Sequence, residues 1–391
     1  MIYFSAVGML NALGNNADEI AQNLVRGQAP GMMQSSEWLV QNQPCWMGYV
    51  TADLPAIPPA FSQHDSRNNQ LLLAALEQIR PEVDEAIARF GHERVAVVLG
   101  TSTSGLDEGD RVVSRVHHSE GIGKYHYYQQ ELGDPSRFLA SYLGLSGPAY
   151  TLSTACSSSA RAIISGRRLI ESGLVDVAIV GGADTLSRMP ANGFRSLESL
   201  SAERCKPFGQ HRDGINIGEG VALMLMTKEP QQIALKGIGE SSDAWHMSAP
   251  HPEGKGAIEA INMALADAAL NLSEIGYINL HGTATPLNDQ VESKVIHELF
   301  GETTPCSSTK HLTGHMLGAA GGGEAALSWL ILTRNLSLPV QDFSTFAQDT
   351  SLPPCGLLLA SRELAQRNIL SNSFAFGGNN TCLILGEAKS E

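Results

Sequence analysis

The stretch Thr151-Leu-Ser-Thr-Ala-Cys-Ser-Ser-Ser-Ala-Arg-Ala-Ile-Ile164 runs from a short apolar strand through small residues into a segment whose apolar side chains have helical spacing. The helical signal stops at Gly173, so Cys156 is predicted to lie on a tight strand-to-helix turn, at a helix N-terminus. The helix dipole and the free N–H groups at such a position favour the thiolate. A buried structural cysteine is the alternative, but the small neighbours and the turn favour a nucleophile.

A cysteine nucleophile needs partners, and the second half of the chain holds three candidates. His281 follows the apolar run Ile278–Leu280 and precedes a polar loop. Lys310 and His315 lie five residues apart at the start of a Gly- and Ala-rich helix. A lone histidine is more often structural, but two histidines beside small-residue turns favour catalysis. The histidines without such a setting are interpreted as structural or surface residues: His117, His118, His126, His246 and His251.

Apolar runs alternate with helix-length segments along the chain. Runs of three to six residues without polar alternation predict strands buried on both faces, at Val95–Leu99, Val177–Val180, Val221–Met226, Ile278–Leu280 and Cys382–Leu385. Helices are predicted over Asn69–Ala88, Ser157–Ser172 and Ala257–Ala269. The alternation indicates an α/β protein with helices packed over its sheets.

The two halves of the chain echo each other in the same order. Leu99-Gly-Thr-Ser-Thr resembles His281-Gly-Thr-Ala-Thr, and Gly218-Glu-Gly-Val-Ala-Leu-Met-Leu-Met resembles Gly377-Gly-Asn-Asn-Thr-Cys-Leu-Ile-Leu. Together these echoes favour an internal duplication with a seam near residues 230–250. The stretch from Ser102 to Ser141 has no counterpart in the second half and is interpreted as an inserted cap.

Composition narrows the class of protein. The 391 residues are 43% hydrophobic and 17% charged, which excludes an intrinsically disordered chain. A formal charge of −14 argues against nucleic acid as a partner. The six Cys are scattered without a C-x-x-C pair, so neither a zinc site nor a disulfide framework is predicted, and the protein is expected to be cytoplasmic. No apolar run reaches the length of about 18 residues that a transmembrane helix needs, so no membrane association is expected.

These segments resemble the β-ketoacyl-acyl-carrier-protein synthases of the thiolase superfamily, and the resemblance covers nearly the whole chain. The chain is similar to the elongating branch of this family, which uses a Cys–His–His set. The initiating branch uses Cys–His–Asn, and His315 does not fit that set. The matching segments, in order, are Thr154-Ala-Cys156-Ser-Ser-Ser, Lys206-Pro-Phe, Arg212-Asp-Gly, Gly218-Glu-Gly, His281-Gly-Thr-Ala-Thr-Pro-Leu-Asn-Asp, Lys310, Gly314-His315-Met-Leu-Gly-Ala-Ala-Gly and Ser371-Asn-Ser-Phe-Ala-Phe-Gly-Gly-Asn-Asn.

The resemblance implies a duplicated thiolase-like fold, layered α-β-α-β-α, with two mixed five-stranded sheets. Residues 1–239 would form the half that carries the nucleophile, with the cap inserted at about 102–141. Residues 240–391 would form the half that carries the two histidines and the lysine. The two domain-sized units that the length suggests are thus better described as one fold sharing a single active site.

The resemblance also implies the chemistry, a decarboxylative condensation of a malonyl thioester with an acyl group held on Cys156. The backbone N–H groups of Cys156 and Phe376 would form the oxyanion hole. His281 and His315 would stabilise the enolate through Nε2, and Lys310 would set the local potential, with Glu324 as its ion partner. The remaining positions match family motifs, which implies that Thr283 and Thr285 would hold the pantetheine arm and that Phe374 and Phe376 would form an aromatic gate.

Three residues depart from the family pattern. Most relatives have Gly where this chain has Ala284 and Ala375, and Thr where it has Asn379. An added methyl group restricts a backbone that glycine leaves free, so a specialised ketosynthase for polyenes or polyketides is expected at least as much as a fatty-acid enzyme. The cap tyrosines Tyr125, Tyr127 and Tyr128 would suit a flat unsaturated chain, but ordinary loop packing is the favoured interpretation.

The partner implied by the resemblance is an acidic acyl carrier protein, whose phosphopantetheine carries the substrates, and no further cofactor or metal is expected. A net-negative enzyme needs a local basic patch to dock it, and the candidates are Arg67, Lys124, Arg204 and Lys206. A homodimer or a heterodimer with a related subunit is expected.

Two alternative functions remain. One is a non-catalytic ketosynthase-like subunit that sets chain length in a heterodimer, which the intact Cys156 disfavours. The other is a thiolase acting on coenzyme A thioesters, which would need a second catalytic Cys; Cys382 lies within an apolar strand and does not suit that role.

Overall fold

The computed structural model describes residues 1–388, and its strands form one mixed ten-stranded sheet and a small three-stranded sheet. The large sheet has the order β11-β10-β12-β13-β9-β1-β8-β6-β4-β5. One half consists of β1 (Ile2–Leu10), β8 (Gly220–Thr227), β6 (Val177–Asp184), β4 (Val95–Gly100) and β5 (Ala149–Leu152). The other half consists of β11 (Cys306–Ser307), β10 (Tyr277–Asn279), β12 (Asn368–Phe374), β13 (Asn379–Glu387) and β9 (Ile233–Ser242). The small sheet consists of β2 (Met32–Ser35), β3 (Cys45–Gly48) and β7 (Ile217–Gly218).

The two five-stranded sheets expected from the sequence are the two halves of this large sheet. They meet where β1 and β9 pair antiparallel, over only three residue pairs that run from Ile2–Leu235 to Phe4–Ile233. Each half mixes parallel and antiparallel neighbours. The layered α/β architecture is therefore confirmed, with a short backbone link between its two sheets.

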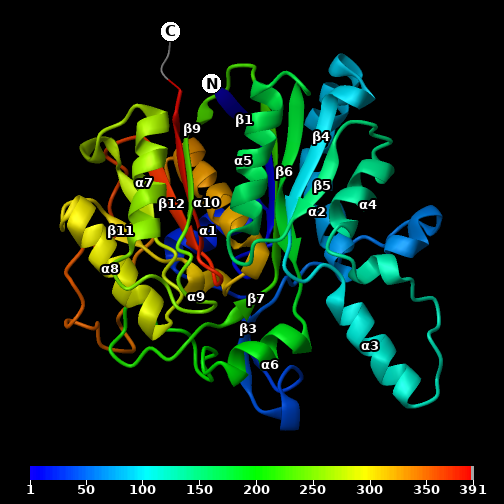
Figure 1. Cartoon of the computed structure of the whole chain (residues 1–391), viewed down its shortest axis with the longest axis horizontal. Coiled ribbons are helices and arrows are strands. Elements are labelled where there is room, and N and C mark those ends of the chain that lie inside the picture. The colour runs from blue at the N-terminus through cyan, green and yellow to red at the C-terminus, as the bar shows by residue number, and fades with distance from the viewer. Residues whose placement is uncertain (389–391) are drawn as a thin grey trace.

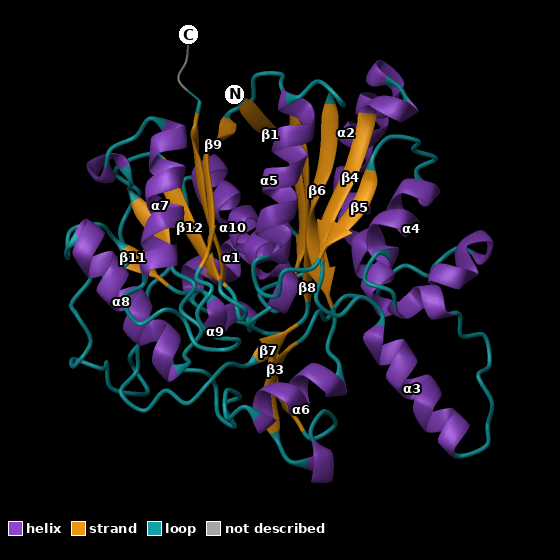
Figure 2. Cartoon of the chain, in the orientation of Figure 1, coloured by secondary structure: helices purple, strands orange, loops and turns teal. Residues whose placement is uncertain are grey.

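Helices lie between and outside the two half-sheets (Figures 1 and 2). The central layer contains α5 (Ser158–Glu171) and α10 (Ala320–Arg334), which pack against each other. Outside the first half lie α2 (Arg67–Phe90) and α4 (Asp134–Tyr142), and outside the second lie α7 (Lys255–Ala268) and α8 (Pro286–Phe300). The other α-helices in the described residues are α1 (Ala17–Arg26), α3 (Leu106–His117), α6 (Arg188–Ser196) and α9 (Lys310–Thr313). In the described residues, no helix has the length and apolar character needed to cross a bilayer.

Small residues let the two central helices approach closely. A Cβ on Gly321 would lie 2.7 Å from Cβ of Ala160, and one on Gly322 would lie 3.1 Å from Cβ of Ser159. The amide of Gly322 also donates a hydrogen bond of 2.7 Å to the Ser159 hydroxyl. The Gly-rich start of α10 is therefore what allows the segment before it, with His315, to reach the start of α5, with Cys156.

The segment 102–141 has two parts that differ in packing. Helix α3 projects from the body of the molecule (Figure 1), with Val113 and Val116 exposed. Helix α4 instead packs on β4 and β5, and its Phe138 is fully buried in the core beside α2. The part of this segment that stands away from the core is thus α3 and the loop that follows it.

Candidate active site

Cys156 lies in the turn between β5 and α5. The preceding residue, Ala155, has a φ of +53°, in the left-handed region that side-chain-bearing residues rarely adopt. The hydroxyl of Ser158 holds this turn by donating to the carbonyl of Ala155 at 2.6 Å and accepting from the amide of Thr154 at 2.9 Å. The thiol is thereby directed into a pocket of about 270 Å³.

Burial controls the ionisation of this thiol. Desolvation raises the pKa of Cys156 to about 11, although the charge of Lys310 and a hydrogen bond from the backbone N–H of Phe376 both act to lower it. The thiolate is therefore not favoured, contrary to the expectation from the helix N-terminus. Removing the thiolate from water costs more free energy than Lys310 and the N–H of Phe376 supply. The free protein holds Cys156 as a thiol at neutral pH.

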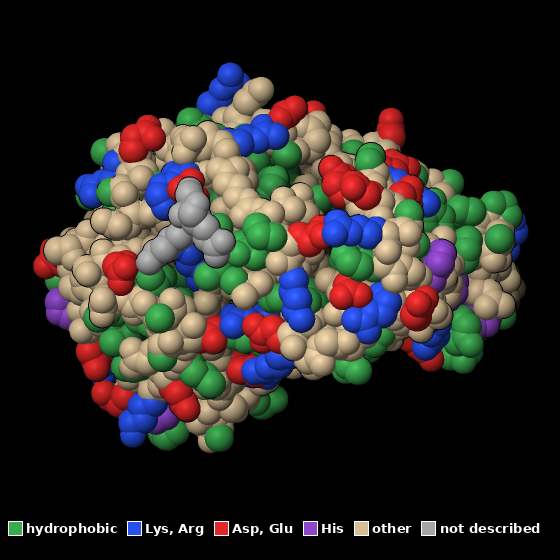
Figure 3. Space-filling model, turned by 90° about the horizontal axis from the view of Figure 1, so that it is seen from above, with side chains coloured by type: hydrophobic (Ala, Val, Ile, Leu, Met, Phe, Trp, Pro, Cys, Tyr) green, Lys and Arg blue, Asp and Glu red, His purple; other side chains and the backbone are tan. Residues whose placement is uncertain are grey.

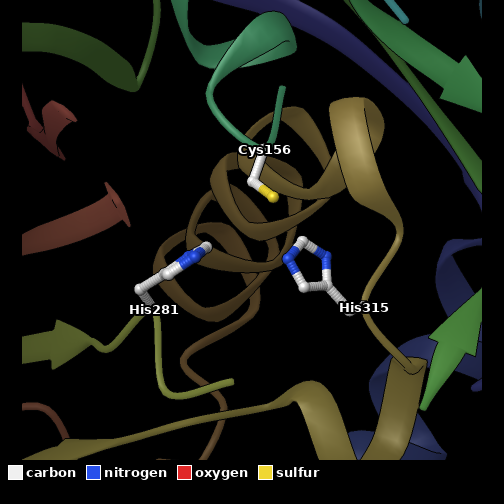
Figure 4. Close-up of side chains that lie close together, drawn as sticks. All are labelled: Cys156, His281 and His315. Atoms are coloured by element: carbon white, nitrogen blue, oxygen red, sulfur yellow. The ribbon is translucent and has the colours of Figure 1, made fainter. Parts of the chain in front are cut away.

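Two histidines face the thiol from the second half of the chain. Figure 4 shows the rings of His281 and His315 turned toward Cys156 from either side. One donor atom from each of the three side chains lies within 4.8 Å of the others, and the ring centroids of the two histidines are 5.5 Å apart at 90°. The Cys–His–His set predicted from the sequence is thus brought together in space, and all three side chains are buried.

Hydrogen bonds determine which ring nitrogen of each histidine carries the proton. Nδ1 of His315 accepts from the amide of Leu317 at 3.0 Å, and Nδ1 of His281 lies 3.4 Å from Nζ of Lys310. Burial and the charge of Lys310 lower the pKa of both histidines well below its usual value. Both rings are therefore neutral, with the proton on Nε2, and both can donate a hydrogen bond into the pocket.

A thiol and two imidazoles are also a donor set that zinc accepts. A neutral imidazole that binds a metal through Nε2 must carry its proton on Nδ1. In His315 that position already accepts the amide hydrogen of Leu317, and in His281 it faces the Lys310 ammonium group. The surroundings of the rings therefore favour hydrogen-bond donation rather than metal binding.

Lys310 and Glu324 form a buried ion pair directly behind the histidines. Nζ of Lys310 lies 2.5 Å from Oε1 of Glu324, and each side chain is no more than 3% exposed. Burial raises the pKa of Glu324, while Lys310 acts in the opposite direction. The pair keeps a positive charge next to His281 without exposing it to solvent.

The predicted substrate-binding and gate residues line the same pocket. Thr283 and Thr285, whose hydroxyls lie 2.8 Å apart, form part of its wall. The ring of Phe374 packs edge-on against that of His281, with ring centroids 6.1 Å apart. The ring centroids of Phe376 and Phe194 are 5.5 Å apart. Phe374 and Phe376 line the same pocket as Cys156.

None of the four predicted docking residues lines this pocket. Arg204 and Lys206 border a separate hollow, where Arg204 donates to the carbonyl of His311 and Lys206 pairs with Glu203. Arg67 forms a double hydrogen bond with the buried Glu219. Lys124 is exposed in the loop after α3. On the face seen in Figure 3, Lys and Arg are interspersed with Asp and Glu rather than gathered in one patch.

Other sequence candidates lie away from the nucleophile. The cap tyrosines Tyr125, Tyr127 and Tyr128 do not line the pocket. The ring of Tyr128 instead stacks on that of His64, with ring centroids 5.8 Å apart. Cys382 is fully buried on β13, where desolvation raises its pKa. This placement offers no second catalytic cysteine of the kind a thiolase would use.

Two buried carboxylates that the sequence analysis missed hold the loop after His281. Glu292 accepts the amides of His281 at 2.8 Å and Gly282 at 2.7 Å, and burial raises its pKa to about 7. Asp289 accepts the amides of Ala284 and Phe208. Asp289 and Glu292 have i, i+3 spacing at the start of α8, directly after a polar loop. This spacing is the sequence signal that could have identified them.

Comparisons with known proteins match the chain along most of its length. The model of the β-ketoacyl synthase N-terminal domain matches residues 2–231, and that of the C-terminal domain matches residues 233–344. A 3-oxoacyl-[acyl-carrier-protein] synthase 2 from Synechocystis is 28% identical, over 98% of this chain and 97% of its own. A Staphylococcus aureus protein of the same name is 34% identical, over 62% of this chain and 64% of its own.

The solved structures include one of much higher identity. It is the complex of the ketosynthase ApeO with its chain length factor ApeC, from Xenorhabdus doucetiae. The match has a TM-score of 0.98 and 69% identity, and it covers 99% of this chain and 98% of the other. Together with the Cys156–His281–His315 geometry, these matches show that the chain belongs to the β-ketoacyl synthase family and is a ketosynthase, an acyltransferase of the thiolase-like fold.

Proposed function

We propose that this ketosynthase elongates carrier-bound acyl chains through Cys156, His281 and His315. In the first step the sulfur of Cys156 attacks the carbonyl carbon of an acyl thioester. The bond from that carbon to the pantetheine sulfur breaks, and the pantetheine thiol leaves with the proton that Cys156 loses. The amides of Cys156 and Phe376 are proposed to stabilise the oxyanion, and the N–H of Phe376 that reaches Sγ supports this assignment.

In the second step a malonyl thioester loses carbon dioxide. The electron pair of the broken C–C bond moves to the thioester as an enolate, whose carbon then attacks the acyl group on Cys156. A C–C bond forms, the C–S bond to Cys156 breaks, and the Cys156 thiolate that leaves takes up a proton from water. The observation that carries this proposal is the pair of Nε2–H donors, on His281 and His315, aimed at the space beside the thiol. Lys310, held by Glu324, is proposed to keep His281 in the donating tautomer.

We further propose a specialised polyketide or polyene pathway rather than general fatty-acid synthesis. The 69% identity to the structure of a ketosynthase paired with a chain length factor, against 28% to a 3-oxoacyl synthase, supports this choice. The name of the 3-oxoacyl-[acyl-carrier-protein] synthase relative supports an acyl carrier protein as a partner, and the ApeO–ApeC complex supports a related, ketosynthase-like subunit. We propose that substrates arrive on the phosphopantetheine of the carrier, without a separate cofactor, in the cytoplasm.

The test uses the protein with an acyl carrier thioester and malonyl carrier protein, in the presence and absence of a chain-length-factor subunit. Mass spectrometry should find an acyl adduct on Cys156 and a product longer by two carbons. The Cys156→Ala variant should form no adduct while it keeps its fold. Absence of an adduct with both saturated and unsaturated acyl chains would refute the condensing function. Undiminished pathway output from Cys156→Ala would instead support a non-catalytic partner subunit.

A further inference from the structure

Asp184, the last residue of β6, is a fully buried carboxylate that reaches two segments of the active site. It lies outside the Cys–His–His set and does not line the pocket. Its acceptor atoms are nevertheless saturated by donors from both sides of the site, and these contacts suggest a role beyond filling the core.

The first segment is Thr101–Thr103, at the end of β4. Oδ1 of Asp184 accepts from the hydroxyl of Thr101 at 2.6 Å, and from the amide and the hydroxyl of Thr103 at 2.8 Å each. The amide of Ser102 lies 2.9 Å from Oδ1 and 3.0 Å from Oδ2. The hydroxyl of Ser102 in turn reaches the carbonyl of Ala155, next to the nucleophile.

The second segment is the turn Leu317–Ala319, between His315 and α10. The amide of Ala319 donates to Oδ2 of Asp184 at 3.1 Å. The same turn supplies the amide of Leu317 that fixes the proton of His315 on Nε2. Leu317 has a φ of +51°, a conformation that persists in a non-glycine residue only when its surroundings hold it.

The fit around the carboxylate is tight. A Cβ on Gly318 would lie 2.8 Å from Oδ2 of Asp184 and 2.7 Å from the amide nitrogen of Ser102. The turn can therefore approach Asp184 this closely only with glycine at its centre. The carboxylate accepts hydrogen bonds only from neutral donors, and its negative charge acts on the nearby thiol of Cys156.

We propose that Asp184 is a positioning residue for decarboxylation: it holds the turn Leu317–Ala319, and through the amide of Leu317 it fixes the Nε2–H of His315 toward the enolate oxygen. This inference rests on the proposed function, because it assigns to Asp184 a role in the malonyl step. The charge of Asp184 has a second effect, since it adds to the desolvation that raises the pKa of Cys156. Positioning and charge therefore predict effects of opposite sign on two reactions of the same site.

The test compares Asp184→Asn with the wild type in decarboxylation of malonyl carrier protein and in alkylation of Cys156 by iodoacetamide. The amide keeps the size of the carboxylate but loses its charge and turns an NH2 group toward backbone donors. We expect decarboxylation to fall at least about tenfold, and alkylation at pH 8 to become faster because the pKa of the thiol falls. Asp176→Asn, which alters a surface pair with Arg94 just before the same strand, is the matched control and should change neither rate.

A second variant keeps the test valid if Asp184→Asn fails to fold. Gly318→Ala pushes the turn away from Asp184 but leaves its charge in place, so decarboxylation should fall while alkylation of Cys156 stays at the wild-type rate. Unchanged decarboxylation in either folded variant would overturn the proposal, as would a parallel fall of both rates in Asp184→Asn. If the wild type itself does not decarboxylate malonyl carrier protein, the proposed function fails instead.

Discussion

The ammonium nitrogen of Lys310 lies 3.4 Å from Nδ1 of His281, one of the two histidines that face the nucleophile. The lysine is only 1% exposed, and its other close partner is the Glu324 carboxylate. One buried cation thus has two tasks, one in the stability of the core and one in the protonation of a catalytic ring. These tasks can be separated by mutation.

Removing either member of the pair should destabilise the fold strongly. Lys310→Met leaves the carboxylate of Glu324 unpaired, Glu324→Gln leaves the ammonium unpaired, and each should cost about 3–5 kcal/mol in urea unfolding. The double variant should recover at least half of the summed loss, because no buried charge remains. Condensation should stay low in the double variant, since nothing then holds the tautomer of His281. Recovery of activity together with stability would contradict the assigned role of Lys310.

The pH dependence of Cys156 alkylation follows from its raised pKa of about 11. Well below that value the thiolate fraction grows about tenfold per pH unit. The rate of reaction with iodoacetamide in the free enzyme should therefore rise steadily from pH 7 to about pH 10. Mass spectrometry of the peptide that contains Cys156 measures the rate, and Cys156→Ser supplies the blank. A plateau above pH 8 would show that the helix N-terminus outweighs desolvation.

A change at Ala284 should stabilise the protein. This fully buried residue has a φ of +70°, which costs an L-residue about 1–2 kcal/mol, whereas glycine adopts it freely. After the entropic cost of glycine in the unfolded chain, Ala284→Gly should raise the free energy of unfolding by about 0.5–1 kcal/mol. Ala375→Gly is the control, because Ala375 does not have a positive φ. This change should lower the free energy of unfolding by a similar amount. Equal destabilisation by both changes would disprove the strain.

Charge reversal tests the docking of an acidic carrier protein. Lys124 and Arg204 are exposed, whereas Arg67 and Lys206 are paired with Glu219 and Glu203. Lys124→Glu and Arg204→Glu should each raise KM for carrier-bound substrates about three- to tenfold and leave kcat unchanged. Arg80→Glu, on the outer helix α2, is the control. The effect should shrink in high salt, and an unaltered KM in both variants would place docking elsewhere.

The sequence predicted the strands and the reactive residues better than their electrostatics. The buried runs appear as β4, β6, β8, β10 and β13, because unbroken apolar stretches have few other stable conformations. The link between the sheets depends on which edges meet in space, and the sequence does not encode this locally. The assignment of residues 1–239 and 240–391 to two duplicated halves, with a cap at about 102–141, stays a proposal.

The state of Cys156 could not be predicted from its neighbours in the chain. Its pKa is raised by desolvation and lowered by the charge of Lys310 and the N–H of Phe376, two residues that are distant from Cys156 in sequence. The roles of Glu292 and Asp184 were missed for the same reason. Each carboxylate acts through backbone amides of another segment, which carry no side-chain signature.

The three residue pairs between β1 and β9 join two parts of the chain that each supply only some of the catalytic residues. The nucleophile comes from before this junction, and both histidines come from after it, so neither polypeptide piece alone holds a working set. If the chain is cut in the segment Glu229–Gln231, where Pro230 is exposed, we expect each of the two fragments alone to be inactive. Turnover would then require both fragments together, so recovered activity would measure their reassembly.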